Sequence, residues 1–306
     1  MNRKLLIEFM RPFTLLAPAL GFFSGGFTAM GAEPITPFSF KILYFILSGS
    51  LMAALLNAAS NSLNQIYDLE IDKINKPKRP LPSGRMTIRD AWIITVVLYV
   101  ISWILAWLIM PGLHHECFYL VIIASFLTYL YSVPPFRTKR LGIFANLTIA
   151  IPRGILLKVA GWSSVKSIIG IEPWYIGCIF GLFLLGSSST KDFSDMKGDA
   201  AGNCVTLPIK YGIKKAAYMI SSFFILPFAL IPIGVHYGIL TGHPLSLNIL
   251  GIVLMIYGCY VNYLILRKPD ALATEENHIS WTHMYIMMFI AQIGFALSYL
   301  IKFLLF

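Results

Sequence analysis

Long apolar segments alternate with short polar segments along almost the whole chain. A helix needs about 20 mostly apolar residues to cross a bilayer, and these segments lack the alternation of membrane-spanning strands. Because only helices and closed barrels satisfy every backbone polar group in lipid, the pattern predicts helices. We predict nine transmembrane helices, near residues 13–31, 41–66, 91–110, 117–133, 142–161, 173–190, 215–238, 247–266 and 282–303.

Composition supports this assignment. Hydrophobic residues make up 57% of the 306 residues and charged residues only 12%, against about 25% charged residues in soluble proteins. We therefore expect an all-α membrane protein with a single transmembrane domain, residues 1–306, embedded in the lipid bilayer. The basic and then apolar N-terminal segment has no convincing cleavage site, and we interpret it as a retained first span.

The formal net charge of +10 is distributed unevenly. If nine spans alternate, 19 of the 24 lysines and arginines fall on one side of the membrane. By the positive-inside rule this side is cytoplasmic and carries the N-terminus, with the C-terminus on the opposite side. No basic arm or aromatic-spaced RNA-binding motif accompanies the charge, so we expect no nucleic-acid partner.

The first polar cluster lies at the cytoplasmic end of the second span. Asn64, Asp68 and Asp72 are spaced i, i+4, i+8, which places three oxygen-bearing side chains on one helical face. Carboxylates one turn apart repel each other near lipid unless a cation lies between them. Mg²⁺ suits such a site, because it binds a few carboxylates together with substrate phosphates.

The second cluster follows the sixth span. Asp192, Asp195 and Asp199 are spaced i, i+3, i+7 on one helical face, and Gly198 is expected to loosen or end that helix. Two opposed sets of carboxylates suggest two metal ions that hold one anionic group between them. The alternative is an ordinary pair of polar loops, but aspartate near lipid is usually functional.

Cations beside both clusters fit a phosphate-bearing ligand. Arg79 lies between prolines after the first cluster, and Lys191 directly precedes the second. The positive-inside rule is the better explanation for the presence of Lys76 and Lys78. For Arg79, the positive-inside rule and a functional role are equally supported.

The loop after the fourth span combines hydroxyls with positive charge. Tyr131 and Ser132 precede a di-proline, and Arg137 and Lys139 follow it. This arrangement could place hydroxyls and cations at the mouth of a cavity, but an interfacial tyrosine is equally well explained as a membrane anchor.

Two charges lie inside the fifth span, where a charge is costly and usually faces a cavity. Arg153 is a candidate for binding a phosphate on an acceptor substrate, and we expect Lys158 to extend its ammonium group toward the interface.

Three strings, NQIYDLEIDKINKPKRPLPSG, YSVPPFRTKR and KDFSDMKGDAAGNCVTLPIKYG, together resemble the UbiA superfamily of intramembrane prenyltransferases. The resemblance covers nearly the whole chain. It implies nine helices around a central cavity and an Mg²⁺-bound prenyl diphosphate beneath a cytoplasmic cap. The cap is expected to consist of loops 67–90, 134–141 and 191–215.

The resemblance also implies roles for individual residues. The expected Mg²⁺–diphosphate ligands are Asn64, Asp68, Asp72, Asp195 and Asp199, with Asp192 as a further ligand. Arg79, Lys191, Tyr131 and Ser132 match family positions near the diphosphate, where Arg137 and Lys139 are also expected to bind. One departure is Ser187, which stands where many members have a tyrosine.

Within the superfamily, the strings look most like members that prenylate geranylgeranylglyceryl phosphate in archaeal lipid synthesis, with geranylgeranyl diphosphate as the expected donor. Chlorophyll-type and quinone-type prenyltransferases, which use aromatic or other lipophilic acceptors, are the alternative. A cation-coupled transporter is a rival from another class. It is disfavoured because transporter sites lie near the bilayer midplane, whereas these acids lie at span ends. The oligomeric state is left open.

Overall fold

The computed structural model describes residues 3–111, 114–275 and 278–305. Every element within these ranges is helical. The elements are α1 (Arg3–Met10), η1 (Pro12–Leu15), α2 (Leu16–Gly31), α3 (Phe40–Tyr67), α4 (Leu69–Asn75), α5 (Ile88–Leu108), α6 (Glu116–Ser132), η2 (Thr138–Arg140), α7 (Ile143–Ala150), η3 (Ile151–Leu156), α8 (Leu157–Ser163), α9 (Ile171–Ser187), η4 (Ser188–Lys191), α10 (Asp192–Ala201), α11 (Leu207–Tyr211), α12 (Ile213–Ser221), η5 (Ser222–Phe224), α13 (Leu226–His236), α14 (Pro244–Leu266), α15 (Ala271–Thr274) and α16 (Ile279–Leu305).

The membrane-spanning helices agree with the hydrophobic pattern. In the described residues, eight helical segments are long and apolar enough to cross a bilayer: Pro12–Gly31, Phe40–Tyr67, Ile88–Leu108, Ile143–Ser163, Ile171–Ala201, Ile213–His236, Pro244–Leu266 and Ile279–Leu305. The predicted fourth span corresponds to the shorter apolar helix Glu116–Ser132. Each predicted span therefore corresponds to a helix, and the all-α membrane fold is confirmed.

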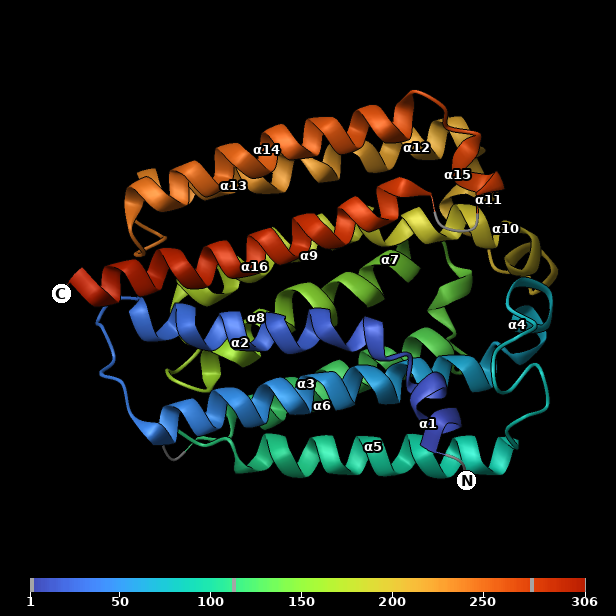
Figure 1. Cartoon of the computed structure of the whole chain (residues 1–306), viewed down its shortest axis with the longest axis horizontal. Helices are drawn as coiled ribbons and strands as arrows, with labels where there is room; N and C mark the ends of the chain where they lie inside the picture. The colour runs from blue at the N-terminus through green and yellow to red at the C-terminus, as the bar shows by residue number, and fades with distance from the viewer. Residues whose placement is uncertain (1–2, 112–113, 276–277, 306) are drawn as a thin grey trace.

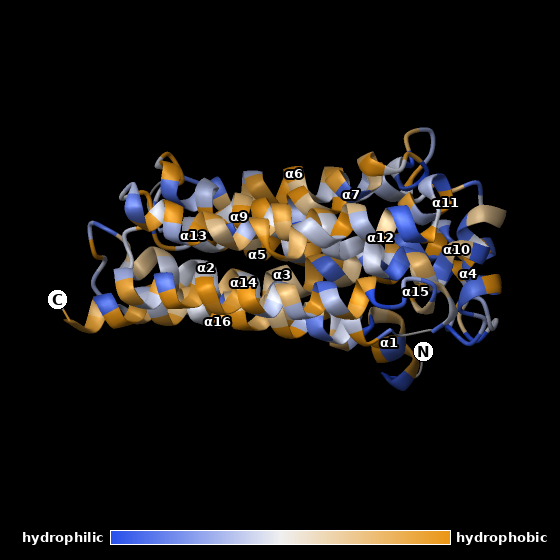
Figure 2. Cartoon of the chain, turned by 90° about the horizontal axis from the view of Figure 1, so that it is seen from above, coloured by the Kyte–Doolittle hydropathy of each residue, from blue (hydrophilic) through white to orange (hydrophobic). Residues whose placement is uncertain are grey.

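The long helices form one elongated bundle, and the polar elements gather at one end of it (Figure 1). The short helices α4, α10, α11 and α15 lie at this end, and α1 with the N-terminus lies on the same side, whereas the C-terminus lies at the other end. Hydrophilic residues concentrate around α4 and α10, and hydrophobic residues cover the middle of the bundle (Figure 2). Segments of the predicted loops 67–90 and 191–215 therefore lie at the same end of the bundle.

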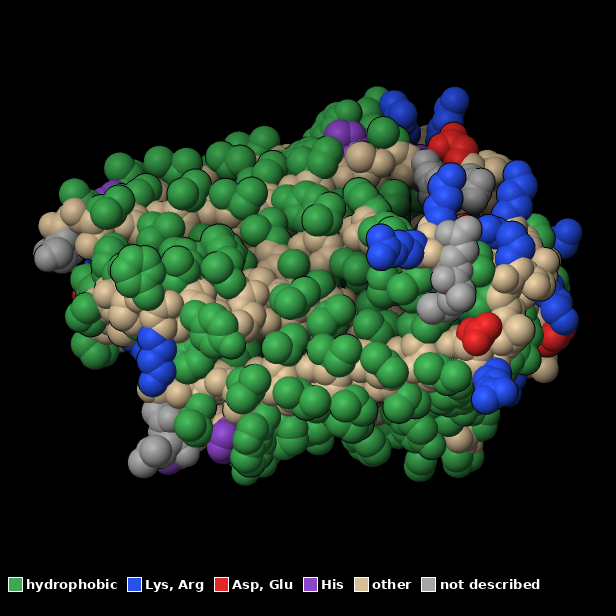
Figure 3. Space-filling view, turned by 60° about the horizontal axis from the view of Figure 1, so that its bottom comes forward, with side chains coloured by type: hydrophobic (Ala, Val, Ile, Leu, Met, Phe, Trp, Pro, Cys, Tyr) green, Lys and Arg blue, Asp and Glu red, His purple; other side chains and the backbone are tan. Residues whose placement is uncertain are grey.

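The outer surface matches a lipid environment. Large apolar side chains remain exposed along the long helices, for example Ile93, Val96, Ile104 and Trp107 on α5. In the space-filling view, apolar side chains form a broad belt along the bundle, and most of the visible lysines and arginines lie at the polar end (Figure 3). Such a large exposed apolar surface is typical of contact with lipid.

The interior packs around close helix contacts at glycines. Gly25 of α2 lies against Gly161 of α8, where a Cβ atom on either residue would come within 3.0 Å of the other's Cα. Gly154 meets Gly181 of α9, and a Cβ on Gly154 would lie 2.5 Å from the Gly181 Cα. Small residues allow helices to approach this closely within membranes. The Gly154 contact fixes the π-helical turn η3, which carries Arg153.

Candidate active site

The first acidic cluster lies where α3 ends and α4 begins. Asp68 is the joint between the two helices, with φ −94° and ψ 13°, and the Asn64 Nδ2 donates to the Asp68 Oδ2 at 3.0 Å. The Asp68 amide donates to the Asn64 carbonyl at 2.8 Å and the Asp72 amide donates to the Asp68 carbonyl at 2.7 Å, so one helix ends and the next begins at Asp68. Asn64, Asp68 and Asp72 consequently face the same cavity, as their spacing predicts.

The second cluster is carried by α10, directly after α9 and η4. Asp192, Asp195 and Asp199 line the same cavity as the first cluster. This cavity extends from the polar end into the bundle, along α2, α3 and α16. The two clusters therefore converge on one space, which is the arrangement that the sequence predicts.

Asn75 joins the two clusters directly, a role that the sequence analysis missed. The Asn75 Nδ2 donates to the Asp195 carbonyl at 2.9 Å, and its Oδ1 accepts from the Gly198 amide at 2.9 Å. A Cβ on Gly198 would lie 2.5 Å from the Asn75 Cγ. The prediction that Gly198 loosens or ends its helix was wrong, because α10 continues to Ala201. Gly198 instead allows Asn75 to approach α10.

Lys76 also bridges the clusters. The Lys76 Nζ lies 3.1 Å from the Asp195 Oδ1, and both side chains are largely shielded from solvent. Sequence reasoning assigned Lys76 to the general excess of positive charge in cytoplasmic loops. The only available signal was its position four residues after Asp72.

Lys139 and Arg137 reach the clusters from the loop after α6. The Lys139 Nζ contacts both the Asp68 Oδ2 and, at 3.2 Å, the Asp199 Oδ1. The Arg137 Nη2 lies 2.8 Å from the Asp68 Oδ1, and Arg137 adopts a left-handed conformation with φ 33°. Burial opposes the charged form of Lys139, but its interactions with Asp68, Tyr131 and Asp199 together outweigh burial and raise the pKa of Lys139 above its usual value.

Arg79 contacts the remaining acid of the first cluster. Its Nη1 donates to the Asp72 Oδ2 at 2.6 Å. Burial raises the pKa of Asp72, and Arg79 opposes that effect. Arg79 therefore supplies the positive charge that a buried carboxylate requires.

The other predicted residues lie around the same cavity. Lys191 and Tyr131 line it, and the Lys191 Nζ lies 5.8 Å from the centre of the Trp281 ring. The Ser132 hydroxyl donates to the Asn64 Oδ1 at 3.4 Å, a long hydrogen bond. Ser187 is buried, and Ser188 lines the cavity with a hydroxyl that has no hydrogen-bond partner in the described part of the chain.

The donor atoms around the cavity fit Mg²⁺. Carboxylate oxygens of five aspartates line it together with the amide of Asn64. Within the described ranges, no three Asp, Glu, His or Cys side chains converge closely enough to hold one ion by themselves. Mg²⁺ usually binds through one or two carboxylates, waters and substrate phosphates, so this donor set suits an ion that arrives with a phosphorylated substrate.

Arg153 and Lys158 have different surroundings. Arg153 lines the cavity and its Nη2 donates to the Asn61 Oδ1 at 3.3 Å. Lys158 is buried inside the bundle, where its Nζ donates to the Ser24 hydroxyl at 2.9 Å and lies 4.1 Å from the centre of the Phe180 ring. The expectation that Lys158 extends to the interface was wrong, because a hydroxyl and an aromatic face satisfy it internally.

The profile of the UbiA prenyltransferase family matches residues 15–293. The chain belongs to this family. It is therefore an intramembrane prenyltransferase, and the transporter alternative is excluded. The matched region includes both acidic clusters and at least part of every membrane span identified above.

Similar proteins agree with this placement. The digeranylgeranylglyceryl phosphate synthase of Methanosphaera stadtmanae is 30% identical over 255 residues, which cover 83% of this chain and 88% of the relative. The bacteriochlorophyll synthase 34 kDa chain of Chloroflexus aurantiacus is 27% identical and covers 95% of this chain and 89% of the relative. A UbiA homolog from Archaeoglobus fulgidus, solved with DMAPP and Mg²⁺, has the same fold, with a TM-score of 0.73, 20% identity and coverage of 96% and 98%.

Proposed function

We propose that the enzyme transfers a geranylgeranyl group from geranylgeranyl diphosphate to geranylgeranylglyceryl phosphate, with two Mg²⁺ ions. The observation that carries this proposal is the convergence of Asp68 and Asp72 with Asp195 and Asp199 on one cavity that also contains Arg153. The similarity to digeranylgeranylglyceryl phosphate synthase supports this acceptor.

The acidic residues form the metal-binding part of the site. Asn64, Asp68 and Asp72 would supply ligands to one Mg²⁺ ion, and Asp192, Asp195 and Asp199 would supply ligands to the other, with diphosphate oxygens and waters as the remaining ligands. When bound, the ions neutralise the diphosphate and so make it a better leaving group. The solved homolog of the same fold, bound to DMAPP and Mg²⁺, supports a diphosphate site that contains Mg²⁺.

The basic residues bind the diphosphate itself. Arg79, Arg137, Lys139 and Lys191 donate to its oxygens and stabilise the negative charge that develops as the bond between the allylic C1 and the bridging oxygen breaks. Ser132 and Tyr131 add hydroxyl donors at the same end of the cavity. Trp281 and Tyr285 lie on the cavity wall, where their rings exclude water and face the developing positive charge on the prenyl group. The oxygen of the acceptor hydroxyl then forms the new bond to C1 and gives up its proton to the departing diphosphate.

The membrane orientation follows from the charge distribution. The polar end of the bundle carries most lysines and arginines and holds the N-terminus, so we place it in the cytoplasm. A water-soluble diphosphate head group then enters from the cytoplasm, and the prenyl chains remain at membrane depth.

An aromatic acceptor is the second candidate. The similarity to a bacteriochlorophyll synthase over 95% of this chain favours it. The two candidates differ in the acceptor and share the donor chemistry, so a single assay separates them.

The test is incubation of the purified protein with geranylgeranyl diphosphate, Mg²⁺ and a panel of acceptors, followed by mass spectrometry. The expected product comes from geranylgeranylglyceryl phosphate and not from homogentisate or a chlorophyllide. Asp68→Asn and Asp195→Asn should each lower kcat by on the order of 10²–10³-fold. The exposed Asp270→Asn on the same side is the control and should leave the rate unchanged. Normal Mg²⁺-dependent turnover by both cluster variants would refute the metal assignment.

A further inference from the structure

Two arginines face the cavity without a carboxylate partner. Arg11 and Arg153 both line it, and neither forms an ion pair with any residue that the structure describes. The cations at the acidic clusters differ, because Arg79, Arg137 and Lys139 each contact an aspartate. Arg11 and Arg153 therefore carry positive charge without a carboxylate in direct contact.

A chain of hydrogen bonds connects the two arginines. The Arg153 Nη2 donates to the Asn61 Oδ1 at 3.3 Å, and the Asn61 Nδ2 donates to the Thr14 hydroxyl oxygen at 2.9 Å. The Thr14 hydroxyl donates to the Arg11 carbonyl at 2.8 Å. Asn57 fixes the same turn by donating to the Thr14 carbonyl at 3.0 Å. The arginines thus belong to one connected polar group that spans the N-terminal turn, α3 and η3.

Irregular backbone presents both side chains. Arg11 adopts a left-handed conformation, with φ 59° and ψ 65°, immediately before Pro12. Arg153 lies on the π-helical turn of the fifth predicted span, next to Pro152. Both conformations are uncommon and concentrate at functional sites. Burial, together with the nearby positive charges of Arg79 and Arg153, lowers the pKa of Arg11 to about 10, although Asp72 opposes this effect. An anion between the arginines would relieve this repulsion.

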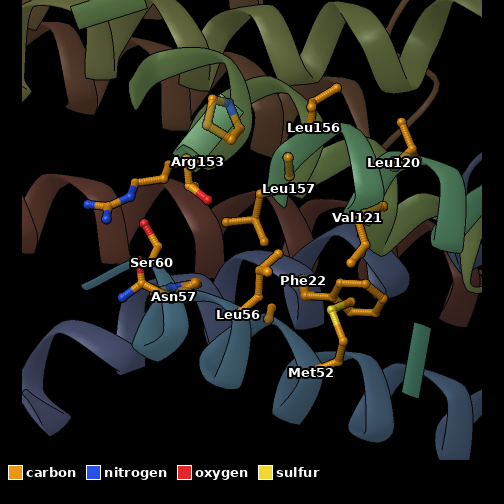
Figure 4. Close-up of a pocket in the computed structure, with 16 residues that line it drawn as sticks. Phe22, Met52, Leu56, Asn57, Ser60, Leu120, Val121, Arg153, Leu156 and Leu157 are labelled. Carbon is orange, nitrogen blue, oxygen red and sulfur yellow. The ribbon is translucent and has the colours of Figure 1, made fainter. Parts of the chain in front are cut away.

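The polar group borders an apolar chamber. This second, smaller cavity lies between α2, α3, α6 and η3–α8 and shares Asn57, Ser60 and Arg153 with the main cavity. Figure 4 shows Arg153 with its guanidinium directed away from the apolar side chains, beside Ser60 and Asn57, while Phe22, Met52 and Val121 line the opposite part. The combined site is amphipathic, with two arginines at one end and an apolar chamber at the other.

We infer that Arg11 and Arg153 bind the phosphate of the acceptor lipid, and that the chamber beyond Arg153 holds its hydrocarbon chain. The inference rests on the proposed function and adds a specific acceptor subsite to it. A phosphomonoester carries a charge of about −1.5 to −2, which matches two guanidinium groups better than a single carboxylate does.

The position of this subsite suits the reaction. Asn61 lies seven residues before Asp68 on α3, which corresponds to about 10 Å along the helix axis at 1.5 Å per residue. A phosphate held at this depth is separate from the diphosphate at the acidic clusters. The glycerol hydroxyl, a few bonds from the phosphate, then lies between the two anions, where C1 of the donor becomes reactive.

The first experiment measures KM for each substrate separately. Arg11→Gln and Arg153→Gln should each raise KM for geranylgeranylglyceryl phosphate by about 10-fold or more, because each loses a charge-assisted hydrogen bond. In both variants, KM for geranylgeranyl diphosphate should stay within about twofold of the wild-type value. Wild type should prefer the phosphorylated acceptor over geranylgeranylglycerol, the same lipid without phosphate, and the variants should lose this preference. The variants Arg11→Lys and Arg153→Lys keep a positive charge and should recover part of the affinity for the acceptor that the Gln variants lose. Arg89 is exposed, so Arg89→Gln serves as the control and should leave both KM values unchanged.

The second experiment fills the chamber. Ala124 is buried on its wall, and Ala124→Leu should raise KM for the full-length acceptor while leaving KM for a short-chain glycerol phosphate ether and for the donor unchanged. Turnover of the short-chain acceptor shows that the variant is folded.

Each other result contradicts a specific statement. A rise in KM for the donor in the arginine variants would assign Arg11 and Arg153 to the diphosphate, and an unchanged acceptor KM would remove them from substrate binding. If wild type still uses the phosphorylated acceptor, either result would overturn the inference without refuting the proposed function. Wild type that used only aromatic acceptors would instead refute the proposed function itself.

Discussion

Asn75 offers a sharp test of the reasoning about the site, because it joins the two acidic clusters without belonging to either. Its side chain makes two hydrogen bonds of 2.9 Å to the backbone of α10, at Asp195 and Gly198. Asn75→Ala removes both. At about 1 kcal/mol for each bond, α4 and α10 lose about 2 kcal/mol of the free energy that holds them together.

This loss should act mainly on metal binding and catalysis. In Asn75→Ala the ions themselves must bring the two clusters together. The Mg²⁺ concentration for half-maximal rate should therefore rise by up to about 30-fold, the equivalent of 2 kcal/mol. At saturating donor and acceptor, kcat should fall by about 10²-fold if the groups are misplaced by about 1 Å, and high Mg²⁺ should restore part of it. The thermal midpoint should fall only slightly, because the helices of the bundle keep their packing.

The assay is an Mg²⁺ titration of initial rates for wild type, Asn75→Ala and Asn248→Ala. Asn248 is a partly buried residue of α14 far along the chain from the site and serves as the matched control. An Mg²⁺ dependence of Asn75→Ala that coincides with wild type would show that the contact between α4 and α10 does not position the carboxylates.

Further predictions concern backbone packing and pH. Gly154→Ala would place a Cβ 2.5 Å from the Gly181 Cα, so the substitution should displace η3, which carries Arg153. We expect kcat/KM to fall more for the acceptor than for the donor. An equal fall for both substrates would contradict the acceptor role of η3. The His278 Nδ1 accepts from the Ser280 amide at 3.3 Å at the start of α16, and burial lowers the pKa of His278 below its usual 6.5. The imidazole of His278 therefore takes up a proton at a higher pH in the unfolded chain than in the folded protein. The free energy of unfolding should keep its full value above about pH 6.5 and decrease as the pH falls below it. The decrease should be about 1 kcal/mol, the value of one helix cap. His278→Asn should remove this pH dependence in a thermal unfolding series.

The sequence predicts the helices and the cavity-facing acids because both depend on local spacing. Apolar segments long enough to span a bilayer have one regular solution, and residues four apart on a helix share a face whatever the rest of the fold does. Asn64, Asp68 and Asp72 illustrate this, since they reach one cavity even though the helix is interrupted at Asp68.

Contacts between distant elements were beyond such reasoning. Asn75 and Lys76 reach the second cluster only because α4 and α10 meet, and nothing in their own neighbourhood specifies that encounter. Arg11 was counted only as a positive charge near the N-terminus, and its left-handed backbone has no signature in its sequence. The error at Lys158 has the same origin, because its partners Ser24 and Phe180 lie on other helices.

The pairing of aspartates with lysines and arginines has a consequence for biogenesis. Lys76, Arg79, Arg137 and Lys139 already pair with four of the five cluster aspartates at the polar end of the bundle, so repulsion between carboxylates opposes assembly less. In small zinc domains, by contrast, metal binding supplies the free energy of folding itself. A chain newly inserted into the bilayer can therefore complete its architecture first and acquire its divalent ions later, together with the substrate.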